Sequence, residues 1–125
     1  AVEVIDSRYK DFKFDLKSVI ADNSSSSRYV TGGQARDIKD LDLKTLGVVM
    51  EINGEVVQLG AGAAVLGQPA TSIAMLANMM AERDEGLKAG TYILSGAITA
   101  AMSVKKGDNV TVKFQDLGSL SMKFV

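Results

Sequence analysis

Asn53-Gly54 lies between two apolar runs, residues 45–51 and 56–60, and this arrangement constrains the fold more than any other feature of the chain. Asn and Gly both tolerate a positive φ, so the pair is typical of the two-residue type I′ turn that joins neighbouring antiparallel strands. We therefore predict a β-hairpin near the middle of the chain. The rest of the fold must then be built around antiparallel strand pairing.

Other short apolar runs, rich in β-branched residues and bounded by polar or glycine-containing segments, predict further strands. We expect them at residues 2–7, 17–21 and 92–94, with a closing hairpin formed by residues 110–114 and 120–125. Gly60 and Gly62 form a G-x-G pair. Val65 stands where a dinucleotide-binding fingerprint has its third glycine, so we interpret the pair as a packing element.

One good helix is predicted after Pro69, the only proline, because proline is favoured at the first helical position. Apolar residues then recur at helical spacing, at Ile73, Leu76, Ala77, Met80 and Ala81. Gly86 has the residue type expected where a helix ends. With six or seven strands, the predicted class is α+β: one domain with a curled, mainly antiparallel mixed β-sheet and one main helix.

Histidine and cysteine are both absent, which excludes disulfides, zinc sites and Ser-His-Asp or Cys-His catalysis within this chain. The oxygen ligands that remain favour Mg²⁺ or Mn²⁺. Lys and Arg number 14 against 15 for Asp and Glu, a balance that indicates neither nucleic acid nor a membrane surface as partner. No apolar run reaches the roughly 20 residues of a membrane-spanning helix and no leader opens the chain, so we expect a cytoplasmic protein.

Glu3 stands in the strand-like run of residues 1–5, and Asp22-Asn23-Ser24-Ser25 follows in a polar cluster that extends to Ser27. A carboxylate buried among β-branched neighbours needs a cation or hydrogen-bond donors. On an edge strand, the same carboxylate would simply face water. The serine run fits a flexible linker, but its apolar flanks favour an ordered loop between strands.

Several segments of the chain resemble the hydratase/decarboxylase family of the fumarylacetoacetate hydrolase-like superfamily. These segments are V-E-V-I-D-S-R-Y at residues 2–9, F-K-F-D-L at 12–16, A-D-N-S-S-S at 21–26 and R-Y-V-T-G-G at 28–33. The similarity continues through residues 46–51, 60–67 and 118–119. It covers essentially the whole chain but only the C-terminal half of a family member. We therefore expect residues 1–125 to be a fragment of one catalytic domain with a β-roll fold.

The resemblance implies a divalent metal site and a substrate-binding loop. In the family, two glutamates of an upstream E-x-E element and a third on a strand hold Mg²⁺ or Mn²⁺. Glu3 matches the third glutamate, and the E-x-E pair has no match in this chain. Asp22-Asn23-Ser24-Ser25 matches a D-N-A-S element, with Ser24 in place of the alanine. Ser25 is then the expected donor to the substrate carboxylate or dienolate, in a loop shaped by Asp22 and Asn23.

A second substrate-binding loop is implied at Ser95 and Gly96, where the Gly96 backbone would allow an anion to approach closely. The implied reaction is metal-dependent decarboxylation of 2-oxo-3-hexenedioate (4-oxalocrotonate) to 2-hydroxypenta-2,4-dienoate, in meta-cleavage degradation of aromatic compounds. The metal and nearby donors would stabilise the charge that collects on the 2-oxo oxygen. A homo-oligomer and a complex with the partner hydratase are further expectations.

Two alternatives remain open. The sister 2-oxopent-4-enoate hydratases share the metal and D-N-A-S elements, but they typically have D-W-K-I and a serine motif that continues into Cys-Gly. Here Phe12-Lys13-Phe14-Asp15 and Ser25-Ser26 follow the decarboxylase form. The other alternative is a non-catalytic assembly module, which is favoured if the 125-residue chain is complete, because its metal site would then lack ligands.

Overall fold

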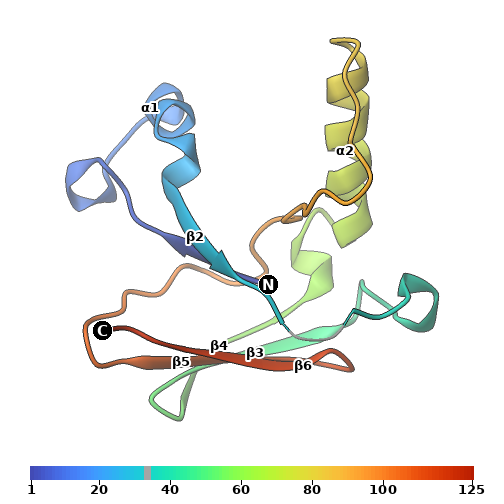
Figure 1. Cartoon of the computed structure of the whole chain (residues 1–125). Coiled ribbons are helices and arrows are strands. Elements are labelled where there is room, and N and C mark those ends of the chain that lie inside the picture. The colour runs from blue at the N-terminus through green and yellow to red at the C-terminus, as the bar shows by residue number, and fades with distance from the viewer. Residues whose placement is uncertain (33–34) are drawn as a thin grey trace.

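The computed structural model describes residues 1–32 and 35–125, and within them six strands form two antiparallel sheets. β1 (Val2–Ile5) pairs with β2 (Ser26–Val30) in the smaller sheet. The larger sheet has the strand order β4-β3-β5-β6, and Figure 1 shows it beneath the smaller one. Its strands are β3 (Gly47–Ile52), β4 (Glu55–Ala61), β5 (Asn109–Phe114) and β6 (Gly118–Lys123).

Two α-helices and four short 3₁₀ turns complete the described fold. α1 (Leu16–Ala21) precedes β2, and α2 (Pro69–Ala81) stands beside the sheets as the main helix. The 3₁₀ turns are Lys10–Phe12, Asn23–Ser25, Ile38–Asp40 and Gly62–Ala64. The predicted α+β class with one main helix is confirmed, although the strands divide between two sheets. The second glycine of the R-Y-V-T-G-G segment lies outside the described residues.

The central hairpin has the predicted turn. Asn53 and Gly54 adopt φ values of 54° and 87°, and Ile52 pairs with Glu55 across the turn. Both φ values are positive, as a type I′ turn requires, and its twist matches that of the flanking strands. The closing hairpin of β5 and β6 is also confirmed.

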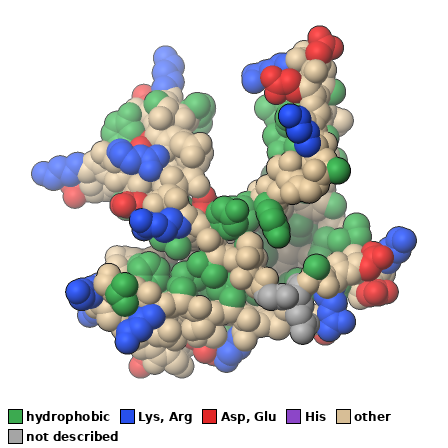
Figure 2. Space-filling model, viewed as in Figure 1, with side chains coloured by type: hydrophobic (Ala, Val, Ile, Leu, Met, Phe, Trp, Pro, Cys, Tyr) green, Lys and Arg blue, Asp and Glu red, His purple; other side chains and the backbone are tan. Residues whose placement is uncertain are grey.

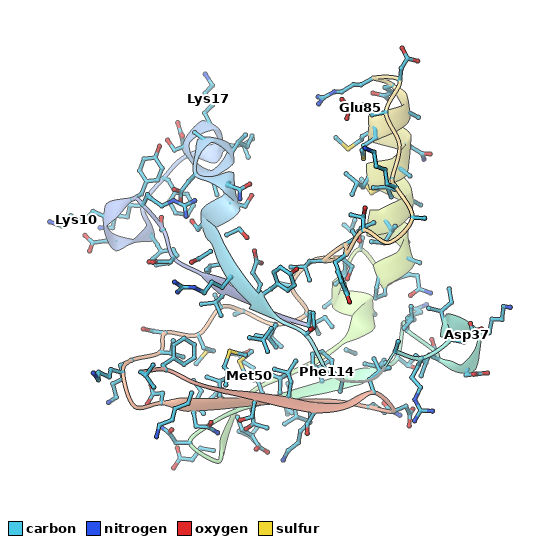
Figure 3. The ribbon with its side chains drawn as sticks, viewed as in Figure 1. Lys10, Lys17, Asp37, Met50, Glu85 and Phe114 are labelled. Atoms are coloured by element: carbon cyan, nitrogen blue, oxygen red, sulfur yellow. The ribbon has the colours of Figure 1, made fainter. Side chains whose placement is uncertain are left out.

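The core lies on one face of the larger sheet. Side chains alternate between the faces of a strand, so the even-numbered residues of β3 and β5 share a face. Val48, Val110 and Val112 are buried there, with Val112 only 1% exposed. Figure 3 shows Met50 and Phe114 on the side of this sheet that faces the smaller sheet, and both pack against the buried cluster. The apolar face of the larger sheet therefore supports β1 and β2.

α2 begins at Pro69 as predicted, but its C-terminus differs from the prediction. The helix ends at Ala81, and Asp84, with a φ of 57°, adopts the left-handed conformation beyond it. The interpretation of Gly86 as the helix-ending residue is therefore wrong. Neither this helix nor α1, within the described part of the chain, has the length and hydropathy that a membrane crossing needs.

Residues 17–21 were expected to form a strand and instead belong to α1. The Asp15 side chain caps this helix by accepting a hydrogen bond of 2.8 Å from the Ser18 backbone N–H. Such a cap satisfies a donor that a helix start leaves free, and here it outweighs the β-branched preference of Val19 and Ile20. The predicted strand at residues 17–21 is therefore wrong.

The predicted buried strand at residues 92–94 is also absent from the described structure, and Tyr92 is 77% exposed. The segment runs instead as an irregular chain whose Ile98 lies directly over Gly60 of β4. A Cβ on Gly60 would stand 2.7 Å from the Ile98 side chain. At Gly62, a Cβ would stand 1.8 Å from the Leu43 carbonyl oxygen. The interpretation of the two glycines as packing elements is confirmed.

Candidate active site

A buried carboxylate, Asp22, is the centre of the candidate site. It lies at the C-terminal end of α1 and is 5% exposed. Its Oδ2 atom accepts hydrogen bonds from the Ser25 hydroxyl at 2.8 Å, the Ser7 hydroxyl at 3.3 Å and the Arg8 backbone N–H at 3.3 Å. Its Oδ1 atom forms a salt bridge with the Arg8 guanidinium. These donors compensate the burial of the negative charge.

The same contacts determine the protonation state of Asp22. Burial raises the pKa of the Asp22 carboxyl, but hydrogen bonds from Ser25 and Arg8 and the positive charge of Arg8 together hold it below its ordinary value. Hydrogen bonds to a charged carboxylate favour the charged form. Asp22 is therefore ionised at neutral pH and acts as an acceptor for the donors around it.

The D-N-S-S segment forms a left-handed turn. Asn23, Ser24 and Ser25 have φ values of 52°, 53° and 59°, which each cost an L-residue roughly 1–2 kcal/mol. The turn is tied down at both ends: the Ser25 N–H donates to the Asp22 carbonyl at 3.0 Å, and the Asp6 N–H donates to the Ser25 carbonyl at 2.8 Å. The prediction of an ordered loop, in preference to a flexible linker, is confirmed. The loop joins a helix to a strand, whereas two strands were expected on its flanks. Backbone strain of this kind is concentrated at functional sites.

Glu3 lies on β1 of the small sheet, whose other strand, β2, directly follows this turn, but Glu3 is exposed. It is paired with Tyr29 in register, and the alternation of β1 buries its neighbours Val2 and Val4 in part. Ile5, two residues further on, pairs with Ser26, which directly follows the turn. Glu3 therefore lies on β1, two residues before the position that pairs with the start of β2. Because Glu3 is exposed, its surroundings resemble those of an ordinary edge-strand glutamate.

The described residues do not form a complete metal site by themselves. Among residues 1–32 and 35–125, no three acidic side chains gather closely enough to hold a metal ion. Glu3 has the hard oxygen donors that Mg²⁺ prefers, but one carboxylate is too few ligands for such an ion. A metal ion bound by Glu3 would need further ligands.

The second predicted group, Ser95 and Gly96, lies at a different place. Gly96 has a φ of 126°, which favours glycine, and a Cβ there would stand 3.3 Å from Val65. Ser95 lines an apolar cavity of about 710 Å³ between α2 and the larger sheet. Figure 2 shows hydrophobic side chains gathered around the hollow where the helix meets the sheets. Glu3, Asp22 and Ser25 do not belong to the lining of this cavity.

Sequence reasoning did not identify Arg8 as a site residue. Fourteen positions separate Arg8 from Asp22, and no motif spacing joins them. Arg8 was visible only as part of the V-E-V-I-D-S-R-Y segment. Its relation to Asp22 depends on the pairing of β1 with β2, which brings the two segments together.

The chain matches the family described as fumarylacetoacetate (FAA) hydrolase, C-terminal, over residues 4–125. It is 66% identical over 124 residues to a 4-oxalocrotonate decarboxylase of Pseudomonas putida, covering 99% of this chain and 47% of that protein. It is 35% identical, over 99% of this chain and 47% of the relative, to 2-keto-4-pentenoate hydratase 1 of Dechloromonas aromatica.

A solved structure is also similar. The 4-oxalocrotonate decarboxylase of Pseudomonas putida complexed with magnesium and adipate matches with a TM-score of 0.94 and 63% identity, over 98% of this chain and 47% of that one. The chain thus spans about half the length of the relatives it matches. The matched residues and this structural agreement show that the chain belongs to the fumarylacetoacetate hydrolase family and corresponds to its C-terminal part.

Proposed function

We propose that the protein containing this chain is a divalent-metal-dependent carboxy-lyase. It would convert 2-oxo-3-hexenedioate (4-oxalocrotonate) to 2-hydroxypenta-2,4-dienoate in the cytoplasm, within meta-cleavage degradation of aromatic compounds. One observation supports this most: identity to a decarboxylase is 66%, whereas identity to a hydratase is 35%, over the same share of the chain. Residues 1–125 would form the C-terminal half of the catalytic domain.

In this proposal Glu3 is one of the ligands of Mg²⁺, or of Mn²⁺ in its place. The ion, when bound, would polarise the 2-oxo group and favour the departure of the distal carboxylate as CO₂. Support comes from the oxygen-only donor set, and from the related Pseudomonas putida structure that contains magnesium. The other ligands would come from outside residues 1–125.

Ser25 would hydrogen-bond to the substrate carboxylate or to the dienolate oxygen that develops during the reaction. A serine hydroxyl has one hydrogen and rotates about its C–O bond. In the described structure that hydrogen points to Asp22, at 2.8 Å between the oxygens, so donation to a substrate requires the hydroxyl to turn. Asp22 and Asn23 would hold the turn from which Ser25 acts. Ser95 and Gly96 would bind a second part of the substrate.

The decisive experiment supplies the complete protein, with Mg²⁺, with 2-oxo-3-hexenedioate and separately with 2-hydroxypenta-2,4-dienoate. We expect CO₂ release from the first and no hydration of the second. Hydration without CO₂ release would replace the decarboxylase proposal with the hydratase. Neither reaction, in a correctly folded protein, would favour the assembly role. Because the related structure contains adipate, we also expect adipate to compete with the substrate.

We further propose that the protein forms a homo-oligomer and associates with the hydratase that acts on its product. Large apolar side chains on α2 support an interface there: Met75 is 49% exposed and Met79 is 58% exposed. Methionine adapts well to irregular contact surfaces. Light scattering of the protein, alone and mixed with the hydratase, tests both associations, and cell fractionation tests the cytoplasmic location.

A further inference from the structure

The guanidinium of Arg8 links three segments of the candidate site. It contacts both the carboxylate and the main-chain carbonyl of Asp22, at the end of α1. Its Nη1 atom also donates to the Asp6 carbonyl, after β1, and to the Ser26 carbonyl, at the start of β2, each at 3.3 Å. Hydrogen bonds to acceptors in several directions require a planar, forked donor group. A lysine ammonium offers the charge without the fork.

These contacts bear on Ser25 through Asp22. Ser25 is 2% exposed, and its only hydroxyl hydrogen is donated to the Asp22 carboxylate. A buried carboxylate with few donors retains such a hydrogen strongly, because hydrogen bonds to ionised groups are about twice as strong as neutral ones. Arg8 supplies Asp22 with charge-assisted donors of its own. The Asp22 carboxylate therefore depends less on the hydrogen bond from Ser25.

We propose that Arg8 is a positioning residue for the reaction. It supplies hydrogen bonds and positive charge to the Asp22 carboxylate. The Ser25 hydroxyl can then turn from Asp22 to a substrate oxygen as negative charge develops there. Arg8 also holds the left-handed turn of residues 23–25 through the Asp22 and Ser26 carbonyls. It does not itself touch the reacting atoms. This inference rests on the proposed decarboxylase function.

The test uses Arg8→Ala in the complete protein, with Mg²⁺ and 2-oxo-3-hexenedioate. Ser25 is needed mainly as charge develops, so we expect kcat to fall by about 10- to 100-fold while KM stays within about threefold. The Arg8 side chain is 52% exposed, so added guanidinium can reach the space that Arg8→Ala leaves. Millimolar guanidinium chloride should therefore restore a large part of kcat.

Arg28→Ala is the matched control. Arg28 lies on β2 of the same sheet, pairs in register with Val4 and makes no ion pair among the described residues. We expect it to leave kcat nearly unchanged, with or without guanidinium. Arg8→Lys is the variant to use if Arg8→Ala does not fold. It keeps the charge and should fold, but without the fork its kcat should lie below that of the wild type.

Two results would overturn the inference. One is a fully active Arg8→Ala protein. The other is a loss of kcat that follows a fall in Tm and does not respond to guanidinium, because that pattern indicates a purely structural role. A wild-type protein that releases no CO₂ would instead remove the proposed function, and this inference with it. If the wild type and the Arg8→Ala variant are both active, the inference about Arg8 is overturned and the proposed function stands.

Discussion

The hydroxyl of Ser25 donates a hydrogen bond of 2.8 Å to the carboxylate of Asp22, and both side chains are buried. This contact ties Asp22 to the last residue of the turn of residues 23–25, which adopt left-handed backbone conformations. A buried, charge-assisted hydrogen bond is stronger than an exposed neutral one. The pair therefore orients the Ser25 side chain before the reaction, and the proposed chemistry begins when its hydroxyl turns from Asp22 to the substrate.

Ser25→Ala should impair catalysis in the complete protein. Removal of one preorganised donor to a developing oxyanion commonly lowers the rate by about 100-fold or more, and we expect a fall of about 100-fold in kcat/KM. Steady-state measurement of CO₂ release checks this. Ser27→Ala, at an exposed position of β2, is the control and should have nearly wild-type kinetics. A Ser25→Ala variant as active as the control would contradict the assigned role.

Stability should fall in acid because two buried aspartates have lowered pKa values. The Asn53 side chain and the Lys105 backbone N–H hold the pKa of Asp108 below its ordinary value of 3.8, while Ser25 and Arg8 overcome the effect of burial to lower that of Asp22. A pKa lower in the folded state means that the ionised group stabilises the fold above the unfolded-state pKa. That contribution is lost as pH falls through the folded-state value.

Urea unfolding of the complete protein as a function of pH measures this effect. These two groups should leave the urea midpoint nearly unchanged between about pH 7 and pH 5. They should make it fall steeply below about pH 4. Asp108→Asn removes one of the titrating groups, so its midpoint should depend less on pH in the acid range. An acid profile identical to that of the wild type would show that Asp108 does not contribute.

Gly62→Ala should destabilise the fold. The added Cβ would stand 1.8 Å from the Leu43 carbonyl oxygen and 3.2 Å from Pro69, and a main-chain carbonyl moves less readily than a side chain. We expect a loss of about 3 kcal/mol in the free energy of unfolding, at the upper end for overpacking. Gly86→Ala is the control, because among the described residues no atom outside its two chain neighbours lies within 4 Å of its Cβ position. Equal stability of the two variants in urea would refute the close packing.

The parts of the fold that were predicted correctly depend on local backbone chemistry. Asn53-Gly54 permits the positive φ values of its turn, and Pro69 begins a helix without losing a hydrogen bond. At residues 17–21 the prediction failed because one side-chain contact outweighed the pattern. Asp15 capped residues that otherwise favour a strand. Residues 92–94 are apolar, but they pass along the surface with Tyr92 exposed.

The candidate site was predictable only in part for a related reason. The D-N-S-S turn is contiguous in sequence, so its residues could be identified from the similarity to a family element. Arg8 reaches Asp22 only because β1 and β2 pair, and a contact across a sheet leaves no spacing signal in a single sequence. Ser95 and Gly96 were assigned to a second substrate-binding loop from the similarity to the family, and the structure places Ser95 in the lining of the apolar cavity beside α2.

Mg²⁺ binding by the complete protein, measured by isothermal titration calorimetry for the wild type and for Glu3→Gln, tests the central proposal most directly. The substitution keeps the shape of the side chain and removes its charge. If Glu3 is a metal ligand, affinity for Mg²⁺ should fall on the order of 100-fold with little change in Tm, because a hard cation depends on charged oxygen ligands. Equal Mg²⁺ affinity in the two proteins would contradict the assignment of Glu3 and leave it an ordinary solvent-facing glutamate.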